Sequence, residues 1–151
     1  MKSDNYYMQL AIDEAKKAKI RGEVPVGSII VGNDGKVSAK GHNLCEELSD
    51  PTAHAELIAI RKLSKKLGSW RLDGTTLFST LQPCLMCMGA IVNARIGRLV
   101  YGTDDPEYEG TNYIYELEDI YPLVKKLSVT NNVLQEDCAL LLKSFFSAIR
   151  K

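Results

Sequence analysis

The sequence lacks an excess of charge of either sign, because 19 lysines and arginines are balanced by 19 aspartates and glutamates. Proteins that attract nucleic acid through the field of the whole molecule are usually basic, so that mode of binding is not indicated. The balance counts mildly against a polyanionic substrate, although a local basic patch would be enough to bind one. Any contact with a phosphate backbone must therefore depend on particular residues.

Long apolar runs are also lacking. Residues 1–5 are polar and lead into a charged amphipathic stretch, so the sequence predicts neither a signal peptide nor a membrane span. The expected location is the cytoplasm. There is no internal repeat, low-complexity tract or linker, and 151 residues are enough for one hydrophobic core. We therefore expect one α/β domain over residues 1–151.

Cysteine is scarce, with four in the chain. A reducing compartment disfavours disulfides, so the closely spaced Cys84 and Cys87 indicate metal ligands or a redox couple. Cys45 and Cys138 stand alone in the sequence. Cys138 is most simply interpreted as a small buried residue on the apolar face of the last helix.

One histidine, two thiols and one carboxylate form a split cluster: His54, Glu56, Cys84 and Cys87. Catalytic zinc typically has three protein ligands and an open fourth position, whereas structural zinc has four protein ligands. We interpret His54, Cys84 and Cys87 as the ligands of one Zn²⁺ per chain. Glu56, two residues from His54, is close enough to move protons to and from a water on the metal.

Two other interpretations of the cluster stay open. A structural zinc site would need a fourth ligand, for which His42, Cys45 or Cys138 could serve. An open site fits the adjacent carboxylate better. A redox C-x-x-C motif would leave both His54 and Glu56 unexplained.

Hydrophobic periodicity predicts five helices, at residues 4–21, 52–67, 84–94, 114–126 and 135–150. The expected strands are residues 26–31, 37–43, 75–81, 98–102 and 127–134. Ser3 and Gly22 mark the two ends of the first helix. Residues 33–36, Asn-Asp-Gly-Lys, predict a hairpin between the first two strands. The strand at 98–102 should run parallel to that at 75–81 if the intervening helix is a crossover.

The metal ligands and Glu56 are predicted to lie at the N-termini of two helices. Thr52 is the expected cap of the second helix, which puts His54 and Glu56 in its first turn. Pro83 suits the first position of the third helix, so the cysteine pair would lie where amide donors favour anionic sulfur. The apolar residues of the last helix that are expected to face inward are Cys138, Leu141, Leu142, Phe145, Phe146 and Ile149.

The order H-x-E followed by P-C-x-x-C is the signature of zinc-dependent nucleobase deaminases. The chain resembles the cytidine deaminase-like superfamily and, within it, the bacterial tRNA-specific adenosine deaminases. The matching stretches lie between about residues 5 and 110: 22–27, 41–43, 50–56, 80–84, 86–87 and 94–98.

The resemblance implies a three-layer α/β fold in which a five-stranded mixed sheet lies between helices, usually in a homodimer. It implies zinc on the three ligands named above, with Glu56 as the proton shuttle. Asn43 would hold the base, although as an isolated residue it is equally a turn residue at a strand end. Val26 would line the pocket, and the backbone near Ala55 and Cys84 would frame the reacting carbon.

The chain departs from the tRNA-specific pattern in places. Gln82 stands where those enzymes usually have glutamate, and residues 130–132, Thr-Asn-Asn, replace an Asn-His-Arg segment. Residues 104–121 carry seven acids and no base, which would repel a phosphate backbone facing them. Asp105 aligns with an acidic residue that touches the anticodon loop in relatives. The terminus, Phe145-Phe146 followed by Arg150-Lys151, resembles that of the family and could place basic groups near a substrate. A solvated helix end explains Arg150 and Lys151 equally well.

The favoured function is hydrolytic deamination of adenosine to inosine at the wobble position of a tRNA anticodon loop, where the base is already splayed out. The alternative is a deaminase of a free nucleobase or nucleoside of the guanine or cytosine class, which the neutral charge and the acidic run favour. A third hypothesis is an RNA-binding accessory subunit without turnover. Intact Glu56 argues against that hypothesis. A tRNA substrate predicts activity that falls steeply as salt rises.

Overall fold

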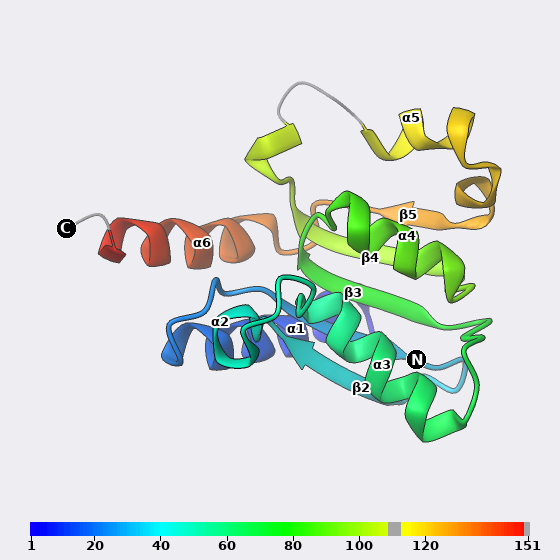
Figure 1. The fold of residues 1–151 in the computed structure, drawn as a ribbon, viewed down its shortest axis with the longest axis horizontal. Helices are drawn as coiled ribbons and strands as arrows, with labels where there is room; N and C mark the ends of the chain where they lie inside the picture. Colours follow the sequence, from blue (N-terminus) through cyan, green and yellow to red (C-terminus); the bar gives the residue numbers. More distant parts are fainter. Residues whose placement is uncertain (109–112, 150–151) are drawn as a thin grey trace.

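Five strands form one mixed sheet in the order β2-β1-β3-β4-β5 (Figure 1). The computed structural model describes residues 1–108 and 113–149. The strands are β1 (Gly27–Val31), β2 (Val37–His42), β3 (Thr76–Leu81), β4 (Arg98–Thr103) and β5 (Ser128–Thr130). β1 pairs antiparallel with β2 and β3, whereas β3 with β4 and β4 with β5 are parallel. The predicted mixed sheet and its parallel crossover are confirmed.

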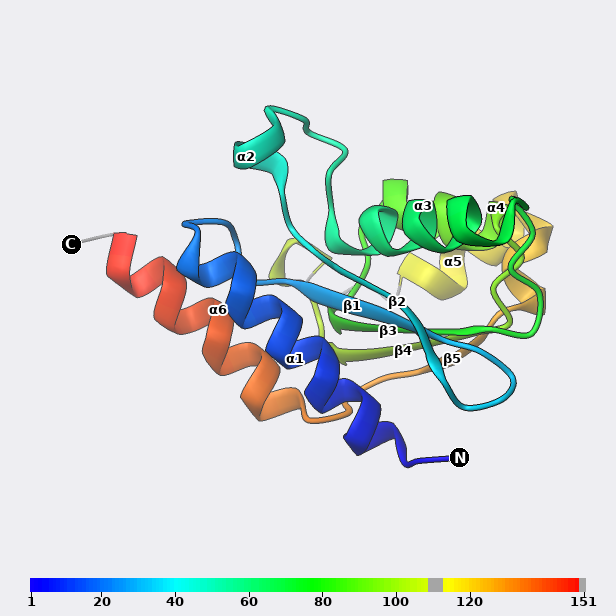
Figure 2. The ribbon, with the colours of Figure 1, turned by 90° about the horizontal axis from the view of Figure 1, so that it is seen from below.

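The helices cover both faces of this sheet. They are α1 (Asp4–Ile20), α2 (Cys45–Leu48), α3 (Ala55–Leu67), α4 (Leu85–Asn93), α5 (Tyr113–Ile120) and α6 (Gln135–Ile149), with 3₁₀ turns at Pro106–Tyr108 and Pro122–Lys126. In Figure 2, α1 and α6 lie on one side of the strands, and α3, α4 and α5 lie on the other. The described residues contain no helix that is both long and apolar enough to span a bilayer.

Each face of the sheet has its own apolar core. Alternate residues of a strand point to opposite faces, and Ile29 and Val31 of β1 pack with α1, while Ile30 packs with α3 and α4. Leu77 and Phe78 of β3 divide in the same way. All five residues of β1 are buried. This two-sided burial fixes the register of the strands and so the positions of the loops at their ends.

Two helix starts differ from the prediction. α3 is capped by His54, not by Thr52, because Thr52 donates its N–H and its hydroxyl to Asp50 Oδ1 at 2.8 Å and 2.7 Å, which forms a turn one step before the helix. α4 is capped by Cys84, so Pro83 lies before the helix and not at its first position. Two of the expected ligands therefore occupy N-cap positions.

The second half of the chain contains further corrections. The helix expected at 114–126 ends at Ile120 and continues as a 3₁₀ turn, because the residue before Pro122 is biased away from helical geometry. The strand expected at 127–134 stops at Thr130, since the positive φ angles of Asn132 (60°) and Leu134 (51°) turn the chain out of the sheet. α2 was not predicted at all.

The last helix is much less buried than expected. Of the six residues predicted to face inward, only Cys138 is buried; Phe146 is 38% exposed and Ile149 is 63% exposed. α6 packs on α1 and β4, and its C-terminal end projects beyond the sheet (Figure 1). The predicted roles of residues 150–151 lie outside the described residues.

Candidate metal centre and active site

The N-termini of α3 and α4 bring three ligand-type side chains together. His54 Nδ1 lies 3.5 Å from Cys84 Sγ and 3.5 Å from Cys87 Sγ. The ligand atoms of all three lie within 4.8 Å of one another. Tetrahedral zinc with Zn–S of about 2.3 Å and Zn–N of about 2.0 Å places sulfur and nitrogen roughly 3.5 Å apart, so the cluster fits zinc without rearrangement.

The N-cap positions explain why these side chains are available. An N-cap side chain usually accepts a hydrogen bond from its own helix, but neither His54 nor Cys84 does so. His54 turns toward α4 and Cys84 turns toward α3. Figure 2 shows these two helices side by side on the same face of the sheet. Cys87, one turn into α4, completes the group and is fully buried.

No fourth protein ligand joins the cluster among the described residues, where this is the sole group of three or more metal-binding side chains. His42 Nδ1 is 3.0 Å from Glu14 Oε2 and is directed to α1. Cys138 packs with α1 and β4 in the core on the opposite face of the sheet. Within that part of the chain, the arrangement is that of an open zinc site rather than a closed structural one.

Hydrogen bonds within the cluster set its protonation. A hydrogen bond from the Cys87 thiol lowers the pKa of Cys84 to about 4, and the same bond raises the pKa of Cys87. The hydrogen bond between His54 and Cys84 raises the pKa of His54. Cys84 is therefore a thiolate at neutral pH, which is the form that binds a metal cation.

Glu56 lies in the first turn of α3, and only 3% of it is exposed. Its carboxyl group hydrogen-bonds to Cys87, and burial raises the pKa of Glu56 to about 7. The predicted proximity of this acid to the metal ligands is thus present in the structure. A carboxyl group that can both lose and take up a proton near neutral pH is suited to proton transfer.

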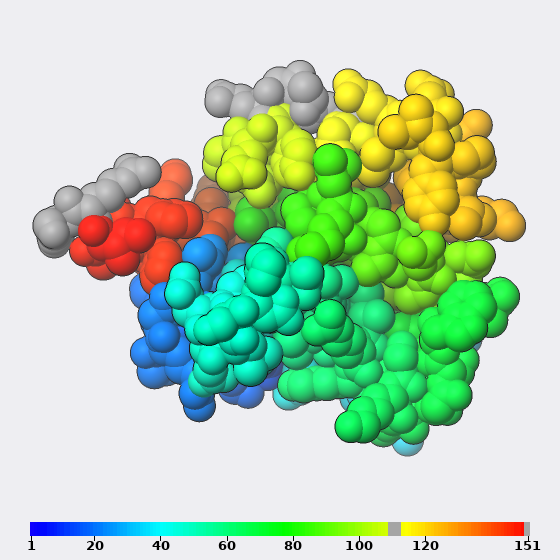
Figure 3. Space-filling model, viewed as in Figure 1, coloured from blue at the N-terminus to red at the C-terminus, as the bar shows by residue number. Residues whose placement is uncertain are grey.

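A cavity of about 700 Å³ opens beside the cluster and is lined by His54, Glu56 and Cys84. Figure 3 shows the surface hollowed where α2, α6 and the segment after β4 meet. Val26 and Asn43, both predicted substrate contacts, line the cavity, and so does Asp105. This volume lies in the range typical of small-molecule sites.

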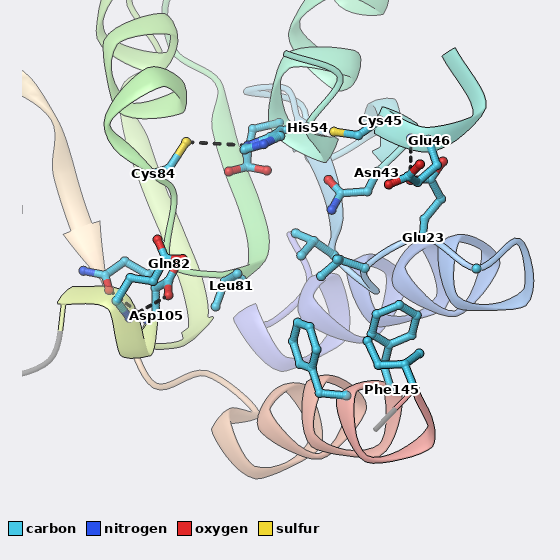
Figure 4. Close-up of a pocket in the computed structure, with 17 residues that line it drawn as sticks. Glu23, Asn43, Cys45, Glu46, His54, Leu81, Gln82, Cys84, Asp105 and Phe145 are labelled. Carbon is cyan, nitrogen blue, oxygen red and sulfur yellow. Dashed lines mark hydrogen bonds between the residues drawn. The ribbon is translucent and has the colours of Figure 1, made fainter. Parts of the chain in front are cut away.

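The contact of the backbone near Ala55 with the substrate stays a prediction. Ala55 is fully buried and does not line the cavity. Its N–H donates to Asn43 Oδ1 at 3.0 Å, so this backbone group supports Asn43. In Figure 4 the nitrogen of the Asn43 side chain points into the cavity and the oxygen points back toward His54 and α3.

Other residues of the cavity were not predicted from the sequence as catalytic or substrate-binding residues. They include Glu23, Cys45 and Glu46, Leu81, and the pair Phe145 and Phe146, which had been expected in the core. Gln82 holds the loop after β4 in place, because its Oε1 accepts the Asp105 N–H at 2.9 Å. Glu23 lies in a stretch that resembles the family, and so does Phe145, but the place of each in the cavity depends on segments distant in the chain and could not be predicted locally.

The cavity is acidic. Among the described residues that line it there is no lysine or arginine, whereas Glu46, Asp105 and Glu107 lie on its walls. The acidic run noted in the sequence therefore does reach the site, through its first members. A phosphate group would not be drawn to these walls.

Comparison with known proteins agrees with the chemistry of the cluster. Residues 1–103 match the family model described as the cytidine and deoxycytidylate deaminase zinc-binding region. The tRNA-specific adenosine deaminase of Bacillus subtilis (strain 168) is 42% identical over 151 residues, which cover 100% of this chain and 93% of that protein.

Solved structures with the same fold include relatives of two kinds. One, from a study of A-to-I editing by tRNA deaminases at the wobble position of transfer RNA, is 38% identical with a TM-score of 0.81, and the match covers 91% of this chain and 99% of that one. A guanine deaminase from Bacillus subtilis is 33% identical with a TM-score of 0.66, over 78% of this chain and 77% of that one.

Proposed function

The chain belongs to the family of the cytidine and deoxycytidylate deaminase zinc-binding region, and we propose that it converts adenosine to inosine at the wobble position of a tRNA anticodon by zinc-dependent hydrolysis. The observation that carries the proposal is the three-ligand cluster with buried Glu56 beside a cavity. The choice of substrate is supported by the full-length similarity to a tRNA-specific adenosine deaminase.

The chemistry is divided between the metal and the chain. A zinc ion held by His54, Cys84 and Cys87 would supply a Lewis acid that brings the pKa of a water down to about 7. Glu56 takes a proton as the oxygen adds to the ring carbon that bears the amino group. It delivers that proton to the ring nitrogen and then moves the proton of the added hydroxyl group to the amine. The C–N bond breaks, the ring carbonyl forms, and the amine leaves as ammonia.

Asn43 is proposed to orient the base. Because its Oδ1 is engaged by the Ala55 N–H, the side chain is fixed with its two N–H donors toward the cavity (Figure 4). A purine offers ring-nitrogen acceptors that such a donor can bind. Val26, 5% exposed, provides an apolar surface for the ring. We propose Asp105 as a further substrate contact at the edge of the same cavity.

The neighbours of the target base are proposed to meet α6. Phe145 and Phe146 border the cavity, with ring centroids 5.3 Å apart in an edge-to-face arrangement. Exposed aromatic rings provide stacking surfaces for unpaired bases, worth about 1–3 kcal/mol per base. Such contacts do not require phosphate groups to bind at the acidic walls. An anticodon loop can therefore bind the protein through its bases.

The second candidate is a deaminase of a free nucleobase or nucleoside. The observation in its favour is the lining of the cavity, which has acids but no lysine or arginine among the described residues. The similarity to a guanine deaminase is lower and covers less of the chain. We therefore place this candidate second. Glu56 argues against an accessory subunit without turnover.

We also propose that the whole chain, residues 1–151, acts as one domain in the cytoplasm and forms a homodimer. Leu85 and Met86, on the same helix as the metal ligands, are 55% and 38% exposed. Apolar side chains at such a position are suited to burial by a second copy.

The test is a direct substrate comparison with the zinc-loaded protein. We expect inosine at the wobble position of an anticodon stem-loop, detected by mass spectrometry of the digested RNA, and little ammonia from free adenine, guanine or cytosine. Ammonia from a free base with no inosine in RNA would transfer the assignment to the second candidate. Turnover of any substrate by the protein alone would exclude the accessory subunit.

A further inference from the structure

The buried carboxylate of Glu23 binds the backbone of α2, which forms one wall of the cavity. Glu23 lies between α1 and β1 and is only 2% exposed. Its Oε1 accepts the backbone N–H of Glu46 at 3.0 Å, and its Oε2 accepts that of Glu47 at 2.8 Å. Figure 4 shows the Glu23 side chain extending to the start of α2.

α2 depends on this contact because it has few others. The helix is four residues long, and none of its residues is buried. Its N-cap residue, Leu44, provides no side-chain cap. The ion pair between Arg21 and Glu47 joins the same two segments, but its side chains are 61% and 42% exposed, and exposed pairs contribute little. The Glu23 carboxylate therefore supplies the cap that the local sequence lacks.

The two segments that Glu23 joins are both walls of the cavity. Val24 and Val26 lie on the same loop as Glu23, and Asn43 and Cys45 belong to the segment that leads into α2. The Asn43 N–H also donates to Val26 O at 3.2 Å. A displacement of α2 would therefore change the wall of the cavity beside Asn43.

We propose that Glu23 is a positioning residue that fixes the α2 wall of the substrate cavity through the backbone N–H groups of Glu46 and Glu47. The inference rests on the proposed function for its effect on substrate, and on geometry alone for its effect on the wall. Each carboxylate oxygen binds a different N–H. Glutamine at position 23 would keep one acceptor and turn an N–H donor toward the other backbone N–H.

Cys45 provides a reporter for the wall that does not depend on activity. It lines the cavity in the first turn of α2 and is partly exposed. The other three cysteines are protected in the zinc-loaded protein, two as ligands and Cys138 by burial at 1% exposure. The charge of Glu23 also raises the pKa of the Cys45 thiol, after the larger effect of burial, so alkylation by iodoacetamide is measured over a range of pH and extrapolated to the fully ionised thiolate. That limiting rate, followed by peptide mass spectrometry, reports the accessibility of Cys45 in α2.

The experiment compares Glu23→Gln and Glu23→Met with the unchanged chain, each zinc-loaded. Loss of a hydrogen bond to a charged group corresponds to about tenfold or more in an equilibrium. We expect Cys45 alkylation to accelerate about tenfold in Glu23→Gln and further in Glu23→Met. For the stem-loop, KM should rise by a similar factor while kcat stays within about twofold. Arg21→Ala is the control, with alkylation and KM close to those of the unchanged chain.

Several results would overturn the proposal. One is a Cys45 alkylation rate that is the same in all three proteins. Another is a loss of kcat at constant KM, or a Glu23→Gln protein that loses zinc or unfolds, because the carboxylate would then support the fold as a whole. If the stem-loop is not a substrate, the proposed function fails, and Cys45 alkylation alone decides whether Glu23 holds α2.

Discussion

The Asn43 side chain accepts the N–H of Ala55, the first residue of α3, at 3.0 Å. One bond thus links the end of β2 to the helix that carries His54 and Glu56. It also settles the orientation of the amide, since the oxygen is engaged and the nitrogen is left for a ligand. Asn43, which is proposed to hold the base, is therefore positioned directly by the helix that carries His54 and Glu56.

Asn43→Asp should separate the structural role of the side-chain oxygen, which accepts the Ala55 N–H, from the proposed role of the nitrogen, which donates to the base. Aspartate keeps an oxygen for the Ala55 N–H but removes the donor toward the cavity. We expect a melting temperature close to that of the unchanged chain, full zinc content, and kcat/KM lower by about tenfold to a hundredfold. Steady-state kinetics on the stem-loop and thermal unfolding measure the two effects.

Asn43→Ala is the matched variant, because it removes both interactions. It should lose kcat/KM and also lower the melting temperature. If Asn43→Asp keeps full activity, the side-chain nitrogen does not contact the base, and the proposed role of Asn43 is wrong.

Glu56→Gln should slow the chemical step strongly without loss of the metal. Proton transfer by a positioned side chain contributes about 10²–10⁴-fold to rate, so kcat should fall by that order. Glu56 is not one of the three clustered ligands, and zinc measured by elemental analysis should stay near one per chain. Single-turnover kinetics on the stem-loop would report the slowed step directly.

The matched variant for Glu56→Gln is Cys87→Ser, which removes a ligand that is completely buried. It should lower zinc content together with activity. Zinc loss in Glu56→Gln itself would mean that this carboxylate is a ligand and not a proton carrier. The two variants therefore distinguish a defect of chemistry from a defect of metal binding.

The sequence was most informative where neighbours in the chain determine the structure. Ser3 caps α1 through the Tyr6 N–H at 3.2 Å, as predicted, and Gly68 ends α3 with a φ of 66°. The metal cluster was also predictable, because the short spacing from Cys84 to Cys87 spans a single helical turn. These features depend on interactions over a few residues.

The parts that were missed depend on distant contacts. α2 has no local cap and is held by Glu23, more than twenty residues earlier in the chain. Phe145 and Phe146 have the periodicity of core residues, but α6 extends beyond the sheet, and the ends of the apolar face line the cavity instead. Periodicity indicates which face of a helix is apolar. It does not indicate how far the neighbouring elements extend.

Glu14 makes the stability of the fold depend on pH. Burial alone would raise the pKa of Glu14, but its hydrogen bonds with Lys17 and His42 outweigh burial and hold that pKa below its usual value of 4.5. A group with a lowered folded-state pKa stabilises the fold at pH values above its unfolded pKa. That contribution is lost as pH falls through the folded-state pKa.

Glu14→Gln should therefore be less stable than the unchanged chain at neutral pH, and the difference should shrink below about pH 4.5. Urea unfolding at a series of pH values, with equal zinc loading, measures it. Glu46→Gln, an exposed position, should show a small difference. A difference between Glu14→Gln and the unchanged chain that is independent of pH would mean that the Glu14 contacts do not depend on its charge.

Glu107→Lys tests whether the acidic wall faces RNA. Glu107 is exposed and borders the cavity, so a phosphate backbone passing there is repelled. Lysine should lower KM for the stem-loop several-fold and steepen the fall of affinity with salt by up to about one phosphate equivalent. Glu116→Lys makes the same charge change on an exposed residue that does not line the cavity, and it should have a smaller effect. Equal effects of the two variants would show that only net charge matters, and no effect of Glu107→Lys would favour a free base as substrate.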